Sequence, residues 1–256
     1  MPDRTEYYIE SHGPKEDAVK LGLQWLVQLG NQDTNKQKAL IATRVKRTLE
    51  GVVESVVGEK AVKALKNKNP VTVGDIEMRH MTERIDVHSW SGGPILAVYP
   101  SRDLLDKIDE MRGVTDVLVI PWHRDDVQFW IDQWGATELG SRNAKQNERE
   151  APSIDDNIVE EALHDLDSLV NVSTGLTHSS DRSQAIEMFN ILHRNGYKFD
   201  PEAIRIWLVA EKDWSPTNAD DVQEIAEGVK NGKRFQYESG RWVNDILDQW
   251  KDRAGN

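Results

Sequence analysis

The sequence predicts an α/β N-terminal domain, Rossmann-like with a mostly parallel sheet, followed by an all-α C-terminal domain. Three observations support this fold class. Short apolar runs alternate with helical patterns in the first half of the chain, residues 140–157 contain almost no apolar side chains, and only helical patterns follow. We therefore expect an α/β domain over residues 1–140, a polar linker over 141–157 and a helical domain over 158–256.

Four strand–helix units follow one another in the first domain. The predicted strands are the apolar runs at residues 7–10, 39–43, 94–100 and 116–121. After the first run, Val19, Leu23 and Leu26 are spaced as on one face of a helix that ends near Gly30. Helical spacing also follows the other runs, around residues 52–65, 103–111 and 126–134. Because strand–helix–strand units place consecutive strands parallel to each other, the four units predict a parallel sheet.

Residues 69–93 fit two patterns. Ile76, Met78 and His80 alternate as in a strand, whereas Met78 and Met81 also suit a helix, so a fifth strand is one alternative. At the end of this segment, SWSGGP (89–94) places two glycines before a strand. These glycines predict a flexible turn, with a lid or a loop of close backbone approach as the alternative.

Five short helices are predicted after the linker. They are expected at residues 158–170, 181–195, 201–214, 219–230 and 241–251. We expect Asp181 to cap the second of them. Asp200 followed by Pro201 is typical of a helix N-cap and first helical residue, and predicts the start of the third.

The charge balance limits the partners. With 44 Asp and Glu against 32 Lys and Arg the net charge is −12, and residues 151–256, with 20 acidic and 11 basic residues, carry −9 of it. Nucleic acid and anionic membranes bind through basic fields, so neither is expected as a partner. A basic protein is the expected partner if the helical domain binds one.

The absence of cysteine narrows both the chemistry and the compartment. It excludes disulfides, thiolate catalysis and Cys-ligated metals, and it fits a reducing compartment. The N-terminus lacks the pattern of a signal peptide, and no stretch reaches the roughly 18–20 apolar residues of a membrane span. We therefore expect a cytoplasmic protein without a membrane anchor.

The strongest candidate site lies where the predicted strands end. An open parallel sheet binds ligands beyond the carboxyl ends of its strands. Hydroxyl, imidazole, guanidinium and indole groups follow all four strands there, from Ser11, His12, Arg44, Ser101, Arg102, Trp122, His123 and Arg124. Basic groups and helix N-termini at one edge favour an anion. The sequence therefore predicts a binding or sensing protein for a small anionic ligand, with a nucleotide as the favoured class.

The same residues also fit a purely structural interpretation. Ser101, Asp103 and Asp125 are natural N-caps or first-turn acids, and Arg102 and Arg124 would then pair with them or face solvent. Gly13 stands alone after the first strand, so neither G-x-G-x-x-G nor G-x-x-x-x-G-K-[ST] is present. An ordinary NAD or P-loop ATP site is therefore not expected, and no cofactor is identified.

Three further hypotheses remain. His12, Asp17 and His123 would serve a hydrolase or transferase as acid–base groups if their strands are neighbours. A protein-interaction module with an acidic helical domain and no small-molecule site is the second. His80 and Glu83, at i and i+3, would share a helix face that is able to hold a metal, but no second matched motif is present and we predict no metal site.

Overall fold

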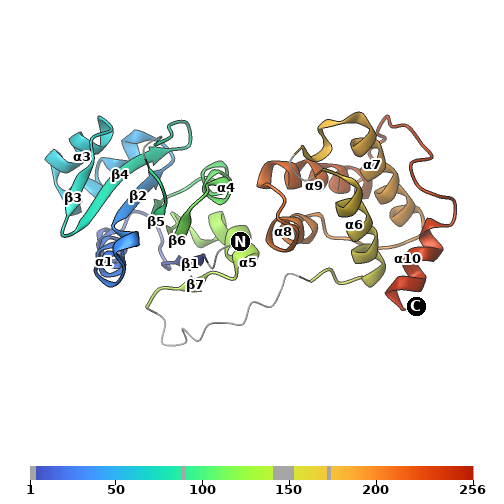
Figure 1. Cartoon of the computed structure of the whole chain (residues 1–256), viewed down its shortest axis with the longest axis horizontal. Coiled ribbons are helices and arrows are strands. Elements are labelled where there is room, and N and C mark those ends of the chain that lie inside the picture. The colour runs from blue at the N-terminus through green and yellow to red at the C-terminus, as the bar shows by residue number, and fades with distance from the viewer. Residues whose placement is uncertain (1–3, 88–89, 141–152, 172–173, 256) are drawn as a thin grey trace. The chain divides into compact units, whose positions relative to one another are not determined.

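The computed structural model describes residues 4–87, 90–140, 153–171 and 174–255. The chain divides into two compact units, Met1–Arg149 and Glu150–Asn256 (Figure 1). The first holds a mostly parallel sheet with helices and the second is helical, which confirms the predicted fold class. Most of the linker predicted at 141–157 lies outside the described residues, so its limits stay a prediction.

One sheet of seven strands is formed by the part of the first unit that the structure describes. Its strands are β1 (Thr5–Tyr8), β2 (Lys38–Thr43), β3 (Val71–Val73), β4 (Ile76–Thr82), β5 (Gly93–Val98), β6 (Val114–Ile120) and β7 (Thr137–Glu138). Their order across the sheet is β3-β4-β2-β5-β6-β1-β7, and every neighbouring pair is parallel except β3 with β4.

The position of β1 distinguishes this sheet from the familiar doubly wound order. In that order the first strand lies between the second and fourth parallel strands. Here β1 pairs with β6, where Tyr8 lies opposite Val119, and with β7, where Tyr8 lies opposite Glu138. As a result, the carboxyl end of β1 is next to that of β6, and the end of β2 is next to that of β5.

Helices cover both faces of the sheet. They are α1 (Glu16–Gln32), α2 (Val52–Val57), α3 (Glu59–Lys66), α4 (Arg102–Glu110) and α5 (Gln128–Trp134). Side chains of α1, α2 and α3 share one apolar core with Ile41, Leu96 and Leu118 of the sheet. Leu104 of α4 and Trp130 of α5 are buried outside that core, because α4 and α5 pack on the opposite face (Figure 1). This division follows from the right-handed crossing of each strand–helix–strand unit.

Glycine allows α1 to cross the sheet closely. A Cβ at Gly22 would lie 2.7 Å from Cδ1 of Leu96 in β5 and 3.2 Å from Cδ1 of Ile120 in β6. The helix therefore passes over β6 and β5 as it carries the chain from β1 to β2, and it buries Val19 and Leu26 completely.

A buried carboxylate joins the two helices of the opposite face. Asp109 of α4 forms an ion pair with Arg4 at 2.8 Å and accepts hydrogen bonds from Trp130, Gln133 and Trp134 of α5. Burial of a charge is tolerated when its hydrogen-bonding capacity is satisfied in this way. The network holds α4 and α5 together beside the start of β1.

Residues 69–93 contain an antiparallel strand pair. Both β3 and β4 fall in this segment, so the strand alternative for His80 is confirmed and a helix there is wrong. The glycines of SWSGGP lie at the start of β5, at the edge of the sheet opposite the predicted site. A Cβ at Gly93 would lie 2.2 Å from the carbonyl oxygen of Lys38, which also accepts a hydrogen bond from Trp90 Nε1 at 3.0 Å. Close backbone approach therefore explains Gly93.

The end of β5 corrects the predicted strand 94–100. The strand stops at Val98, and Tyr99 has a φ of +51°, a left-handed conformation that is uncommon for a bulky side chain. Tyr99 and Pro100 therefore belong to the loop that leads to α4. This loop contributes to the carboxyl edge of the sheet.

The second unit consists of α6 (Asn157–Leu169), α7 (Ser179–Arg194), α8 (Pro201–Lys212), α9 (Pro216–Lys230) and α10 (Ile246–Ala254). The Asp200 cap is confirmed, because its carboxylate accepts the Glu202 N–H at 3.1 Å. The Asp181 cap is wrong: α7 begins two residues earlier, and Asp181 lies in its first turn. The last helix begins five residues later than predicted, since Glu187 binds the N–H groups of Gly240 and Arg241.

Tryptophans anchor the helical unit through their indole N–H groups. Trp250 and Trp214 are fully buried and donate to Asp165 at 2.8 Å and to Asp167 at 2.7 Å, both on α6. Paired indole and carboxylate groups satisfy each other inside the core.

Among the described residues, none of the helices has the length and apolarity needed to span a membrane.

Candidate functional site

Two switch points lie along the carboxyl edge of the sheet. The chain leaves β1 and β2 toward the face of α1–α3, and leaves β5 and β6 toward the face of α4 and α5. Neighbouring strands therefore diverge between β6 and β1 and again between β2 and β5. Loops separate at such points and leave a crevice, which is where open α/β sheets bind ligands.

The two candidate histidines meet at the first switch point. The Gly13 N–H donates to the Trp122 carbonyl at 2.7 Å, which joins the loop after β1 to the loop after β6. Beside this bond, Nδ1 of His12 lies 3.1 Å from Nδ1 of His123, and the ring centroids are 4.4 Å apart. The tertiary structure thus brings together two side chains that the sequence predicted only at the same edge.

Arg124 binds protein groups at the same switch point. It donates to Glu10 at 3.3 Å and to Gln128 at 3.1 Å, and its guanidinium lies 5.2 Å from the centre of the Tyr8 ring. These contacts reduce its capacity to bind an anion. His123 is the N-cap of the turn that follows, and Asp126 accepts its N–H at 3.1 Å. Asp125 is an acid of the first turn, one of the two roles that the structural interpretation gave it.

A carboxylate lies at the second switch point. Ser101 donates to Glu83 at 2.6 Å and accepts the Leu104 N–H at 3.4 Å, so it caps α4 as the structural interpretation predicted. Nε of Arg44 is 4.0 Å from the same carboxylate, with 68% of its side chain exposed. Glu83 therefore offsets the positive charge that the sequence predicted here.

Two of the candidate residues have other surroundings. The guanidinium of Arg102 lies 4.5 Å from the centre of the Phe129 ring, in the contact between α4 and α5. Ser11 is buried, and its hydroxyl donates to the Gly13 carbonyl at 3.4 Å. Arg102 therefore packs between helices, and Ser11 stabilises the first loop.

A buried pair lies below the second switch point. Thr43 Oγ1 donates to the Val45 carbonyl at 3.0 Å, so it accepts the Nε2 proton of His80 at 2.7 Å. Burial, with a smaller contribution from the charge of Lys46, lowers the pKa of His80 to about 4. His80 thus supports the end of β2 as a neutral ring.

A pocket of about 450 Å³ opens beside these loops. It is lined by residues that follow β1, β2, β5 and β6: Pro14, Val45, Arg47, Thr48, Glu50, Gly51, Val52, Tyr99 and Trp122. Trp122, 43% exposed, packs edge-on against Tyr99 with ring centroids 5.2 Å apart. Of the residues predicted for the site, Trp122 lines this pocket.

Tyr99 was missed by sequence reasoning because it was assigned to the strand. Its hydroxyl accepts the Lys15 N–H at 3.2 Å, at the start of α1. Burial raises the pKa of Tyr99, and this hydrogen bond opposes the effect. The left-handed φ turns the chain out of β5 at this residue. Strained backbone of this kind is frequent at binding sites.

Arg47 was not predicted from the sequence because it does not directly follow a strand. It lies four residues beyond β2, in a short 3-10 turn (Lys46–Leu49) that no periodic pattern marks. Arg47 forms no ion pair with any residue that the structure describes. Lys66 pairs with Glu50 and lowers its pKa, with a smaller contribution from Arg47. Arg47 is therefore the cation of the pocket wall that is available to a ligand.

The alternative of a metal site required His80 and Glu83 to lie on one face of a helix. His80 and Glu83 lie on and just after a strand, so they do not share a helix face. Within the described ranges, no group of three or more His, Asp and Glu side chains is arranged to hold a metal ion.

Comparisons with known proteins gave a family-model match within the second unit and a solved structure that resembles part of the chain. Residues 155–251 match the family model described as "Domain of unknown function (DUF1889)". The matched residues lie within the second unit. A protein from Salmonella typhimurium with a crystal structure has 27% sequence identity to this chain. The match covers 38% of this chain and 95% of that chain, and the TM-score of the two structures is 0.34. No curated protein matches the sequence.

Proposed function

We propose that the α/β domain binds or senses a small anionic ligand at the carboxyl edge of its sheet, in the pocket beside Trp122. The favoured ligand class combines a planar ring with an anionic group, as a nucleotide does. The observation that carries the proposal is that one pocket at the switch points is lined by both exposed aromatic surface and an arginine that forms no ion pair with any described residue. The volume of about 450 Å³ falls in the usual range for small-molecule sites.

The aromatic wall supports the ring. Trp122 exposes part of its indole while Tyr99 fixes its orientation from the side. Stacking against such a ring contributes about 0.5–1.5 kcal/mol beyond simple burial.

The anionic part is supported by Arg47. A guanidinium binds carboxylate and phosphate through two parallel hydrogen bonds. Arg44 is exposed nearby in sequence but lies near Glu83, and Arg124 is bound to Glu10, so Arg47 is the stronger candidate.

A second candidate function is favoured by the histidine pair. The 3.1 Å contact between His12 and His123 meets the distance condition for shared acid–base work in a hydrolase or transferase. Neither ring lines the pocket beside Trp122, however. A reaction would therefore need substrate that extends from the pocket to the first switch point.

The protein-interaction alternative rests on charge. The large apolar side chains exposed on the described part of the second unit are Leu169, at the end of α6, and Val243, in the loop before α10. A basic partner for this acidic unit, which contains the residues that match the DUF1889 model, remains the proposal that charge alone supports. The absence of cysteine likewise supports a reducing, cytoplasmic location.

Thermal unfolding followed by Trp fluorescence tests the ligand proposal. The probes are adenosine monophosphate, ribose 5-phosphate and succinate, each against wild type and the variants Arg47→Ala, Trp122→Ala and Arg112→Ala. Ligand at 100 times its Kd adds about 2.7 kcal/mol, which raises the unfolding temperature by several degrees. Arg112, exposed before β6 at the opposite edge, is the matched control.

We expect adenosine monophosphate to raise the unfolding temperature of wild type and Arg112→Ala, and to lose this effect in Arg47→Ala and Trp122→Ala. A shift that persists in Arg47→Ala, or the absence of a shift with all three probes, would overturn the proposal. A shift with succinate alone would overturn the part of the proposal that assigns a planar ring to the ligand.

A further inference from the structure

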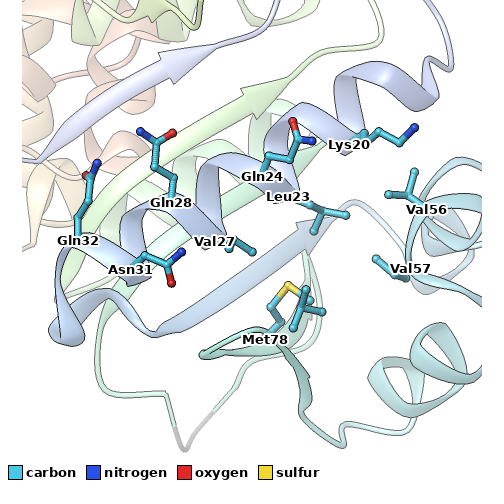
Figure 2. Close-up of a pocket in the computed structure, with 11 residues that line it drawn as sticks. Lys20, Leu23, Gln24, Val27, Gln28, Asn31, Gln32, Val56, Val57 and Met78 are labelled. Atoms are coloured by element: carbon cyan, nitrogen blue, oxygen red, sulfur yellow. The ribbon is translucent and has the colours of Figure 1, made fainter.

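A second, larger hollow lies on the face of the sheet that α1, α2 and α3 cover, between α1, α2 and the β3–β4 edge. Its volume is about 780 Å³. The apolar side chains that line it are Leu23, Val27, Val56, Val57, Val73 and Met78. Figure 2 shows Leu23 and Val27 on the flank of α1 that faces Met78 and α2. The neutral amides of the same helix that also line the hollow are Gln24, Gln28, Asn31 and Gln32.

The break in the helical layer explains the hollow. α2 has six residues and ends at Val57. The next residue, Gly58, has a φ of +87°, so the chain turns there and continues as the separate helix α3. The floor of the hollow is Met78 of β4, which is buried. Val27, Val56 and Val57 are half-buried, and Val73 is 38% exposed, so solvent reaches apolar surface here.

The hollow has little charge on its lining. Of the described residues that line it, Lys20 alone carries a charge. Lys20 precedes Leu23 by three residues and Val27 by seven, so all three lie along the same flank of α1. Lys20 forms no ion pair with any residue that the structure describes. One ammonium group therefore stands at the end of an apolar row.

This arrangement selects one class of occupant. Small-molecule sites of a few hundred cubic ångströms are mostly apolar, with few polar groups that fix orientation. A cation at one end of an apolar surface complements a molecule with an apolar body and a single terminal anionic group. The anion replaces water at the ammonium while the body covers Val27 and Met78.

We propose that this hollow is a binding site for an amphipathic anion, with its apolar body against Leu23, Val27 and Met78 and its anionic group at Lys20. The site is separate from the pocket beside Trp122 and does not depend on the function proposed for that pocket.

The test uses the full chain and the fluorescent probe 1-anilinonaphthalene-8-sulfonate, which carries fused rings and one sulfonate. We expect saturable binding at one site, weakened by added salt and displaced by decanoate. Val27→Trp and Val73→Trp, on α1 and on β3, fill the hollow from two sides and should each weaken binding at least about tenfold. Lys20→Glu should weaken it by about tenfold and reverse the salt dependence, because salt then screens a repulsion between two anions.

Matched controls separate this site from the others. Leu21→Trp adds the same indole to α1 at an exposed position that does not line the hollow, and should leave the affinity unchanged. Trp122→Ala should also leave it unchanged, so a failure of the proposal for the pocket beside Trp122 is distinguishable from a failure of this one. Circular dichroism verifies that each variant is folded.

Three outcomes would overturn the proposal. They are the absence of saturable binding, binding that persists in both indole variants at the hollow, and a dimer in sedimentation that Val27→Trp dissociates. The last result would show that a second copy of the chain covers the hollow.

Discussion

His12 and His123, 111 residues apart in the chain, are joined through their Nδ1 atoms at 3.1 Å. An imidazole nitrogen accepts a hydrogen bond only when it carries no proton, so one Nδ1 donates and the other accepts. The pair therefore fixes the loop after β1 to the loop after β6, next to the bond between the Gly13 N–H and the Trp122 carbonyl.

Replacing His123 with Ala should loosen this junction. A single hydrogen bond contributes about 0.5–1.5 kcal/mol, so exchange of the Gly13 amide proton should accelerate by roughly 2- to 12-fold. Amide exchange measured by NMR checks this, with His193→Ala, an exposed histidine of the second unit, as the control. Unchanged exchange at Gly13 would show that its own hydrogen bond suffices.

His80 should make the α/β domain sensitive to acid. Its pKa is lowered from 6.5 to about 4, chiefly by burial, so the folded state binds the proton less readily than the unfolded state. The associated stability is present above pH 6.5 and is lost as the pH falls from 6.5 toward 4. The shift corresponds to about 3 kcal/mol.

NMR titration of the imidazole resonances measures this pKa, with His80→Gln to assign the signal. The variant should lose less stability than wild type between pH 7 and pH 4.5, by roughly 2–3 kcal/mol. A His80 resonance that titrates near pH 6.5 would contradict the prediction.

Asp109 should be essential to the packing of α4 on α5. Asp109→Ala removes one of the two carboxylates paired with Arg4, the other being Glu6, and the acceptor of three α5 donors, so we expect a loss of about 3–5 kcal/mol in the free energy of unfolding. Asp109→Asn keeps one acceptor oxygen and should cost less. Asp103→Ala, an exposed acid in the first turn of the same helix, should cost about 0.5 kcal/mol. Urea unfolding measures all three, and equal losses for Asp103 and Asp109 would be inconsistent with the network.

Gly93 should tolerate no side chain. A Cβ there would lie 2.2 Å from the Lys38 carbonyl oxygen, and φ is +137°. We expect Gly93→Ala to destabilise the domain by more than about 3 kcal/mol, through a backbone shift as well as conformational strain.

Gly74→Ala is the matched control for that variant. Gly74 has a φ of +61°, and the nearest atom to its Cβ position is 3.9 Å away. It should therefore cost only the conformational term, about 1 kcal/mol. Thermal unfolding of the two variants compares them, and similar midpoints would refute the steric argument.

The sequence predicted the elements better than their limits. The apolar runs located β2, β5 and β6 because buried parallel strands need continuous apolar sequence. The limits failed where one residue's conformation or one distant contact decided them. Tyr99 left the strand through a left-handed turn, and Glu187 bound the backbone N–H groups that would otherwise have begun the last helix early.

The candidate site followed the same division. The sequence placed Ser11, His12, Trp122 and His123 at one edge, because parallel strands all end on the same side of a sheet. It gave no signal for Tyr99 and Arg47, because the first appeared to continue an apolar strand and the second lies in a short turn without periodicity.

By itself, the sequence determined the composition of the two units, the parallel direction of the main strands and the side of the sheet on which the polar loops lie. These properties depend on local spacing, burial and the right-handed crossover. Only the tertiary structure decided the order of the strands. That order places β1 beside β6 and separates it from β2, because α1 crosses two strands before the chain re-enters the sheet. Which side chains meet, His12 with His123 or Thr43 with His80, depends on that crossing, and contacts between distant segments leave no periodic trace in the sequence.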